Sequence, residues 1–216
     1  MRKLIALLAA TTAFTVAFDA IAEDAEPAEE VPTIQMGKIT EFNGTWEKAA
    51  SIDTRLDELE ANVAAAHEQT KTAAGVATDA PLEKAFEDIK ATAGDKLVGA
   101  LEGDKVTVSA TEDAPENVKE FAAAANKAGE SLEAALKDAT KLKEDAQALI
   151  EEATAIPSSI TPDLIKNAGM KKPKDIKAEK DLQAGNVAIV KTFPAQADGV
   201  ISAATEFVTL AKSLIP

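Results

Sequence analysis

The chain has 216 residues, with 37 Asp plus Glu against 23 Lys plus Arg, one histidine and no cysteine. Its formal net charge of −14 argues against a nucleic-acid partner, because binding to phosphates gains affinity from Lys and Arg. The lack of cysteine excludes disulfides, thiolate metal sites, a Cys–His nucleophile pair and a lipid anchor on cysteine.

Residues 1–22 predict a secretory signal peptide. Arg2 and Lys3 precede an apolar run over residues 4–18, and the small residues Ala20 and Ala22 follow two positions apart. The run is shorter than the roughly 20 residues of a membrane-spanning helix, although a retained membrane anchor is the alternative. We expect cleavage near Ala22, export to the periplasm or the exterior, and a mature chain of 194 residues with net charge −15.

Residues 23–38 begin with five acids within eight positions and include two prolines. Such a stretch lacks the apolar side chains of a packed core, so we interpret it as a disordered acidic leader. The remainder, residues 39–216, is predicted to be a single helical-bundle domain.

Three long helices are predicted next. Apolar or small residues recur at intervals of three and four from residue 42 to 73, where Gly75 ends the pattern. A second helix has one face made of Leu82, Phe86, Ile89, Ala93, Leu97 and Leu101. A third has an alanine-rich seam up to about Ile156, just before Pro157.

One segment, residues 105–109, alternates apolar and polar residues with the period of a strand, so that Val106 and Val108 share a face. We interpret it as a lone extended connection packed against the end of the bundle, with edge-on pairing to another chain as the alternative. Residues 86–101 and 121–136 also align without a gap, and each stretch is preceded by Asp-Ala-Pro. An internal duplication of residues 79–101 and 113–136 and a shared helical seam both explain this.

Beyond Pro157, Thr161 and Pro162 predict the start of a short helix that Gly169 ends. A fourth helix is predicted from about residue 174 to 192, and Pro194 bends it or opens a fifth helix with a broad apolar stripe. The fold class expected is all-α: an elongated up-and-down antiparallel bundle of three to five helices with coiled-coil-like seams.

Catalytic, metal and cofactor sites are not expected. His67 is the only histidine, so a two-metal carboxylate bundle cannot be assembled. A haem held by His67 and a methionine is conceivable but disfavoured, because Met36 would lie about 46 Å away along a fully helical span and Met170 is predicted to lie in a loop. A Ser-His-Asp site would have to use the same residue, which we interpret as a surface histidine. The sequence therefore predicts a protein that is not an enzyme and needs no cofactor.

Positive charge is concentrated near the end of the chain. Residues 171–216 hold seven lysines against five acids, whereas residues 23–170 hold 14 bases against 31 acids. Five lysines, a possible contact to an anionic surface, lie close together: Lys171, Lys172, Lys174, Lys177 and Lys180. Docking of the same lysines against the acidic first and third helices is the alternative.

Three functional hypotheses follow. We favour a non-catalytic structural, spacer or partner-binding element of the cell envelope, whose partner is another envelope protein or a second copy. The runner-up is a carrier that covers a lipid or another apolar ligand with its amphipathic helices. A membrane-inserting toxin component ranks last, because it would need a long apolar hairpin and "LVGAL" is too short.

Overall fold

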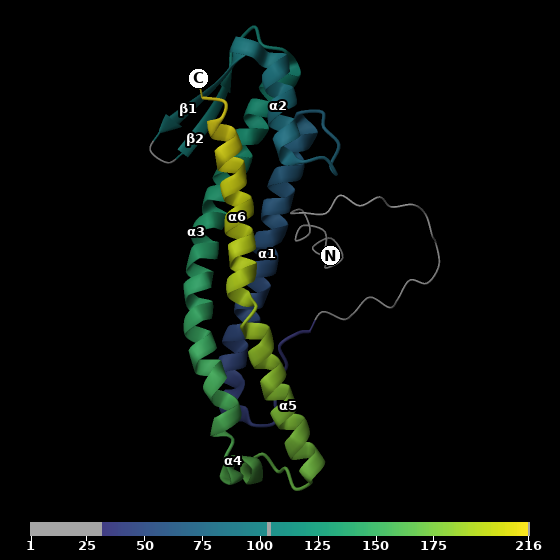
Figure 1. Cartoon of the computed structure of the whole chain (residues 1–216), viewed down its shortest axis with the longest axis vertical. Coiled ribbons are helices and arrows are strands. Elements are labelled where there is room, and N and C mark those ends of the chain that lie inside the picture. The colour runs from purple at the N-terminus through teal and green to yellow at the C-terminus, as the bar shows by residue number, and fades with distance from the viewer. Residues whose placement is uncertain (1–31, 103–104, 216) are drawn as a thin grey trace, which may run out of the picture. The chain divides into compact units, whose positions relative to one another are not determined.

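The computed structural model describes residues 32–215 except residues 103 and 104, so the predicted signal peptide and residues 23–31 lie outside the described residues. Within them the fold is an all-α bundle, as the sequence predicts, to which a small two-stranded sheet is added (Figure 1). In chain order the elements are α1 Asn43–Ala73, α2 Leu82–Ala93, β1 Leu97–Glu102, β2 Lys105–Ala110, α3 Glu116–Ser159, α4 Pro162–Asn167, α5 Pro173–Val190 and α6 Phe193–Lys212.

The chain divides into two compact units. Among the described residues, the first unit comprises residues 32–51 and 149–192, and the second comprises residues 52–148 and 193–215. The long helices α1 and α3 contribute residues to both units. Each unit is described by itself below.

The second unit packs parts of α1 and α3 with α2, α6 and the hairpin. Arg55 on α1 meets Asp138 on α3 at 4.0 Å, and Lys143 on α3 meets Asp198 on α6 at 2.6 Å. Phe86 on α2 packs edge-on against two phenylalanines, one on α3 and one on α6. The predicted seams are confirmed, because most of their members in this unit are buried: Leu56, Val63, Phe121, Ala125, Ala128, Leu132, Ala135, Ala139, Leu142, Ala146, Val200, Ala204, Phe207 and Ala211.

The segment predicted to be a lone strand has a partner. β1 pairs antiparallel with β2, with Gly99 opposite Val108. The sequence interpretation placed Leu97 and Leu101 on a helix, which is wrong: α2 ends at Ala93, and the left-handed φ of +58° at Gly94 turns the chain away. Residues four positions apart lie on one face of a helix, and they also lie on one face of a strand because side chains there alternate with period two. The spacing of the two leucines therefore fits both structures.

Both outer edges of this hairpin are occupied at the Gly99–Val108 pair. On the β2 side, the carboxamide of Asn126 accepts a hydrogen bond from the Val108 N–H and donates one to its C=O, both at 2.8 Å. On the β1 side, the Gly99 N–H donates to the carbonyl of Leu214 at 3.3 Å. A Cβ at Gly99 would lie 3.0–3.1 Å from atoms of Leu214 and Ile215, which is closer than ordinary van der Waals contact. Edge-on pairing with another chain is therefore blocked at this pair.

Most predicted helix ends are confirmed. Gly75 and Gly169 follow α1 and α4 with φ of +72° and +70°, and the Thr161 hydroxyl accepts from the Leu164 N–H as an N-cap. The exceptions are the end of α2, described above, and the end of α3, which passes through Pro157 and ends at Ser159. Pro157 has no N–H to donate to the carbonyl of Ala153, so the helix loses one hydrogen bond near its end. The hydroxyls of Ser158 and Ser159 donate to the carbonyls of Ala155 and Ile156 in this last turn.

Candidate functional site

The clearest constellation of polar side chains lies on α5 in the first unit. Its face toward the protein carries Glu179, Gln183 and Asn186, which are 5%, 0% and 2% exposed. Their spacing of four and three places them on one stripe of the helix with the buried Val187 and Val190. We call these three polar residues the clamp. Because buried polar groups are costly without partners, their partners explain their role.

Glu179 holds the chain just before α1. One carboxylate oxygen accepts from the Lys38 N–H at 2.9 Å, and the other accepts from the Ile39 N–H at 3.3 Å. The second oxygen also accepts from the Gln183 side-chain amide at 2.8 Å. These three donors compensate the carboxylate for the water that it loses on burial.

Asn186 holds the same segment at an earlier residue. Its Oδ1 accepts from the Gln35 N–H at 3.1 Å, and its Nδ2 donates to the Gln35 carbonyl at 2.7 Å. Residue numbers rise along the segment as they fall along α5, so residues 35–39 run antiparallel to this helix. We call residues 35–39 the strap.

Gly37 lets the strap approach α5 this closely. A Cβ at Gly37 would meet Oε1 of Glu179 and Nε2 of Gln183 well inside van der Waals distance. Those two atoms cannot retreat freely, because they are hydrogen-bonded to each other and Oε1 also accepts from the backbone of Ile39. The position therefore requires glycine for space.

The clamp is joined to α1 through the only tryptophan of the chain. The Trp46 indole N–H donates to Oε1 of Gln183 at 2.6 Å, and Trp46 is fully buried. Nearby, the Thr45 hydroxyl donates to Glu152 on α3 at 2.5 Å, which, with a smaller effect of Lys48, holds the pKa of that carboxyl below its ordinary value. Strap, α1, α3 and α5 are thus tied together within one unit.

Sequence analysis missed this arrangement. The strap belongs to the stretch predicted to be disordered, and that prediction does not hold for residues 35–38, which the clamp orders. Two signals were present in the sequence. Gly37 lies two residues before the apolar Ile39, and amide and carboxyl side chains interrupt the apolar stripe of α5. Neither signal indicates which backbone segment the polar side chains would bind.

The five lysines predicted as an anionic-surface contact lie on and just before α5. Lys171 and Lys172 precede the helix, and the other three occupy its first turns. All five are exposed, and none makes an ion pair with any residue that the structure describes. We call them the lysine patch. Docking of these lysines against acidic groups of α1 or α3, the alternative considered above, is not seen among the described residues.

His67 is not the surface histidine expected. It is half-buried on α1, its ring stacks on Phe207 with centroids 6.3 Å apart, and its Nε2 is buried without a hydrogen-bond partner. Desolvation lowers its pKa from 6.5 to about 4, with a further lowering by Lys71, while a hydrogen bond with the Ala203 backbone opposes the shift. A lone imidazole in this setting is a packed side chain of the second unit.

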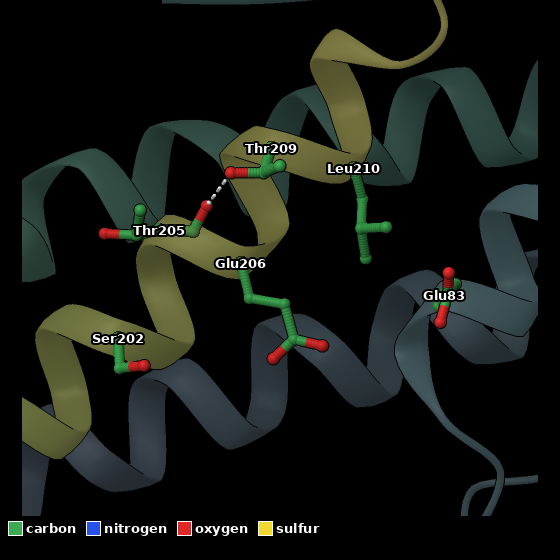
Figure 2. A pocket seen from close by; sticks show the side chains of 6 residues that line it. All are labelled: Glu83, Ser202, Thr205, Glu206, Thr209 and Leu210. Carbon is green, nitrogen blue, oxygen red and sulfur yellow. Dashed lines mark hydrogen bonds between the residues drawn. The ribbon is translucent and has the colours of Figure 1, made fainter.

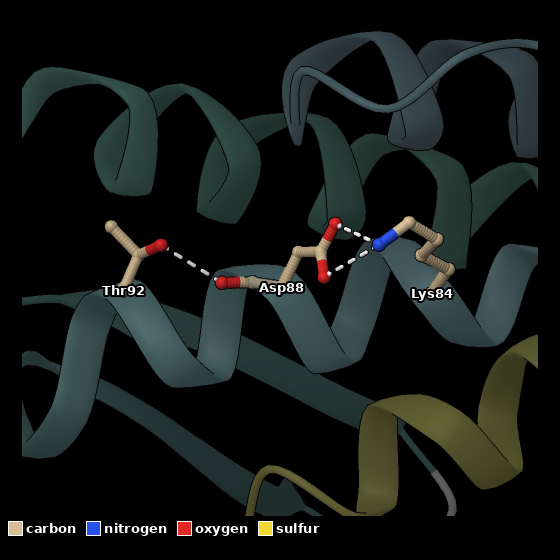
Figure 3. Close-up of polar contacts among 3 residues, drawn as sticks. All are labelled: Lys84, Asp88 and Thr92. Atoms are coloured by element: carbon tan, nitrogen blue, oxygen red, sulfur yellow. Dashed lines mark hydrogen bonds and ion pairs between the residues drawn. The ribbon is translucent and has the colours of Figure 1, made fainter.

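The remaining surface features are shallow or local. An open hollow beside α6 has a volume of about 490 Å³ and is lined by Glu83, Ser202, Thr205, Glu206, Thr209 and Leu210 (Figure 2). On α2, Lys84 pairs with Asp88 one turn later, at 2.8 Å, and Thr92 donates to the Asp88 carbonyl (Figure 3). Within the described residues, no group of three or more carboxylate or imidazole side chains is placed to hold a metal ion.

None of the helices in the described part of the chain has an apolar stretch long enough to cross a membrane. No protein-family model, curated protein or solved structure matches this chain.

Proposed function

We propose that this protein is a non-catalytic helical-bundle protein of the cell envelope or exterior that serves as a structural, spacer or partner-binding element. The lysine patch is the surface that meets an acidic partner, either another envelope protein or a second copy. The observation that supports this proposal is that α5 has two different polar surfaces, one buried and one exposed. Its buried polar residues are engaged in holding the chain's own backbone, and its lysines are exposed and unpaired with described residues.

This arrangement suits recognition at a surface. The clamp holds α5 against the strap and α1, so the helix that carries the lysines is already ordered before a partner arrives. Positive charge grouped on an otherwise acidic protein directs an acidic partner to one place and repels it elsewhere. Contact through exposed lysines is expected to weaken as salt is added.

The carrier hypothesis requires that the apolar face of α6 leave its packed position. The apolar stripe of α6 that would cover a lipid is packed in the second unit, with Val200, Ala204 and Phe207 at most 2% exposed. A lipid-covering state would have to open this unit and lose those contacts, at about 25 cal/mol for each Å² of apolar surface exposed. Large apolar side chains exposed among the described residues are limited to Met36 and Val98.

Native mass spectrometry of the protein purified from its own source tests the proposal. We expect a protein complex that dissociates with added salt and is lost when all five patch lysines are changed to Gln. A matched charge control, with the same change at five other exposed lysines, should keep the complex: Lys84, Lys127, Lys141, Lys191 and Lys212. A co-purifying lipid in place of a protein would contradict the proposal.

Co-sedimentation with anionic vesicles separates the two hypotheses further. The expected mature charge of −15 should keep the wild-type protein in the supernatant at both low and physiological salt. Salt-sensitive pelleting that the patch variant loses and the charge control keeps would favour the carrier instead.

A further inference from the structure

The clamp recognises the strap mainly through its main chain. Four hydrogen bonds join the two, and all of them use backbone groups of the strap: the N–H and C=O of Gln35 and the N–H groups of Lys38 and Ile39. The side chains of Gln35, Met36 and Lys38 are exposed. The clamp makes two demands on the side chains of the strap. Position 37 must have no Cβ, and position 39 must be apolar, because Ile39 is fully buried.

The protein uses the same device a second time. In the hairpin, Asn126 brackets the N–H and C=O of Val108 as Asn186 brackets those of Gln35. A carboxamide that donates and accepts at one residue imitates the edge of a neighbouring strand. The clamp is therefore a site for a short extended peptide, and the strap is the peptide that fills it.

We propose that the clamp is an exchangeable site that takes residues 35–39 of a second copy of this chain as well as its own strap. Because the contacts are made to backbone, they are the same whichever copy supplies the segment. The strap joins α1 through a single 3-10 turn, Thr40–Phe42, which has no buried residue, so releasing the strap gives up the clamp hydrogen bonds and the burial of Ile39 but no buried side chain of this turn. Exchange of an identical element between copies is a route to a dimer that requires no new surface.

Concentration decides between the two states. A strap attached to α1, in the same unit as its own clamp, experiences an effective concentration on the order of millimolar, so a dilute protein keeps its strap in cis. Exchange is favoured when copies are crowded or when the cis contact is weakened. The inference goes beyond the proposed function and does not depend on the lysine patch.

Two complementary variants of the mature chain test the exchange. In the acceptor, Gly37→Leu prevents the strap from docking and leaves the clamp intact. In the donor, Glu179→Ala with Asn186→Ala removes every clamp hydrogen bond to the strap and leaves the strap intact. Alanine suits a helix interior, so α5 itself is retained in the donor.

We expect each variant alone to be a monomer in native mass spectrometry, and the equimolar mixture to show a 1:1 heterodimer. Adding Gly37→Leu to the donor, so that neither chain has a competent strap, should abolish the heterodimer. A mixture without heterodimer, in which both variants retain wild-type helicity by circular dichroism, would overturn the proposal. Loss of helicity in the acceptor would overturn it too, since the strap would then be an integral part of the fold.

A labelled peptide covering residues 32–42 provides an independent measurement. Its fluorescence anisotropy should rise on addition of the acceptor. The peptide should bind the acceptor at least tenfold more tightly than it binds wild-type protein, whose clamp is already filled. The same peptide with leucine at position 37 should not bind. Equal binding of both peptides would contradict the requirement for glycine and with it the proposed site.

Discussion

The indole N–H of Trp46 donates a 2.6 Å hydrogen bond to the side-chain carbonyl of Gln183, although 137 residues separate them in the chain. Both side chains are fully buried. Gln183 in turn donates to Glu179, so a single amide connects α1 to the carboxylate that holds the strap. Because the chain has one Trp and no Tyr, the Trp fluorescence comes from this one side chain and reports on its buried surroundings.

Gln183→Ala should therefore destabilise the first unit. The change leaves the buried indole N–H without an acceptor and removes one donor from Glu179, at an expected cost of about 1–3 kcal/mol in the free energy of unfolding. Urea unfolding followed by Trp46 fluorescence measures it. Gln147→Ala, at an exposed position of α3, is the matched control and should change the unfolding free energy by less than about 0.5 kcal/mol. Equal effects of the two changes would contradict the role of the buried amide.

Gly37→Ala and Gly185→Ala should have opposite effects. The first places a methyl group against Glu179 and Gln183, so the strap must move and its hydrogen bonds weaken, with a loss of about 1–3 kcal/mol. The second adds a methyl group on α5 with no atom within 4 Å, and should stabilise the helix by about 0.5–1 kcal/mol. Urea midpoints of both variants decide, and stabilisation by Gly37→Ala would show that the strap is not packed as described.

The seams and helix ends could be predicted from sequence because they depend on local rules. Apolar residues recur at helical intervals, and Gly75, Gly169 and Pro162 mark boundaries whatever their surroundings. Of the two strands of the hairpin, only β2 was predicted to be extended, because β1 is an apolar run that fits both a helix and a strand. Its pairing with β2 depends on the left-handed turn at Gly94, which sequence does not specify.

The clamp could not be predicted, because its contacts join residues about 140 to 150 positions apart. An acidic stretch with prolines is usually unstructured, and only the position of α5 orders its last residues. The five patch lysines are exposed, as is the general rule for charged side chains, and their contact with an anionic surface stays a prediction. The burial of His67 depends on where α6 packs, which a single amphipathic helix does not reveal.

Asn126→Ala should loosen the hairpin locally. It removes the two 2.8 Å hydrogen bonds that cover the outer edge of β2 at Val108. The Val108 amide should then exchange with solvent deuterium at least tenfold faster, because its N–H loses its acceptor. Asn62→Ala, an exposed change on α1, should leave this rate unaltered. Unchanged protection at Val108 in the first variant would mean that another group covers this edge.

Leu132→Asp should unfold or strongly destabilise the second unit, because Leu132 is 1% exposed in the α3 seam and a carboxylate there loses water without gaining a partner. Ser131→Asp, one residue earlier and exposed, is the matched control and should be tolerated. Thermal melts followed by circular dichroism compare them. A similar midpoint for both variants would show that the seam is not packed in solution.

The burial of His67 predicts a loss of stability in weak acid. Its native pKa of about 4 lies below its ordinary value of 6.5, because desolvation disfavours the charged ring. Between these two values the unfolded chain binds a proton that the native protein does not, so stability falls as the pH falls from about 6.5 toward 4. Above this range the imidazole is neutral in both states and has no such effect.

His67→Phe should remove this component while keeping an aromatic ring beside Phe207. Between pH 7 and pH 4.5, wild type should lose about 2 kcal/mol more unfolding free energy than the variant. This value is smaller than the free energy of the whole pKa shift, because the ring is partly exposed to water. Urea unfolding of both proteins at the two pH values measures the difference, and the carboxylates, which are common to both chains, largely cancel. Equal pH dependence in the two proteins would show that the imidazole is hydrated in the native state, and that Nε2 reaches water despite its burial here.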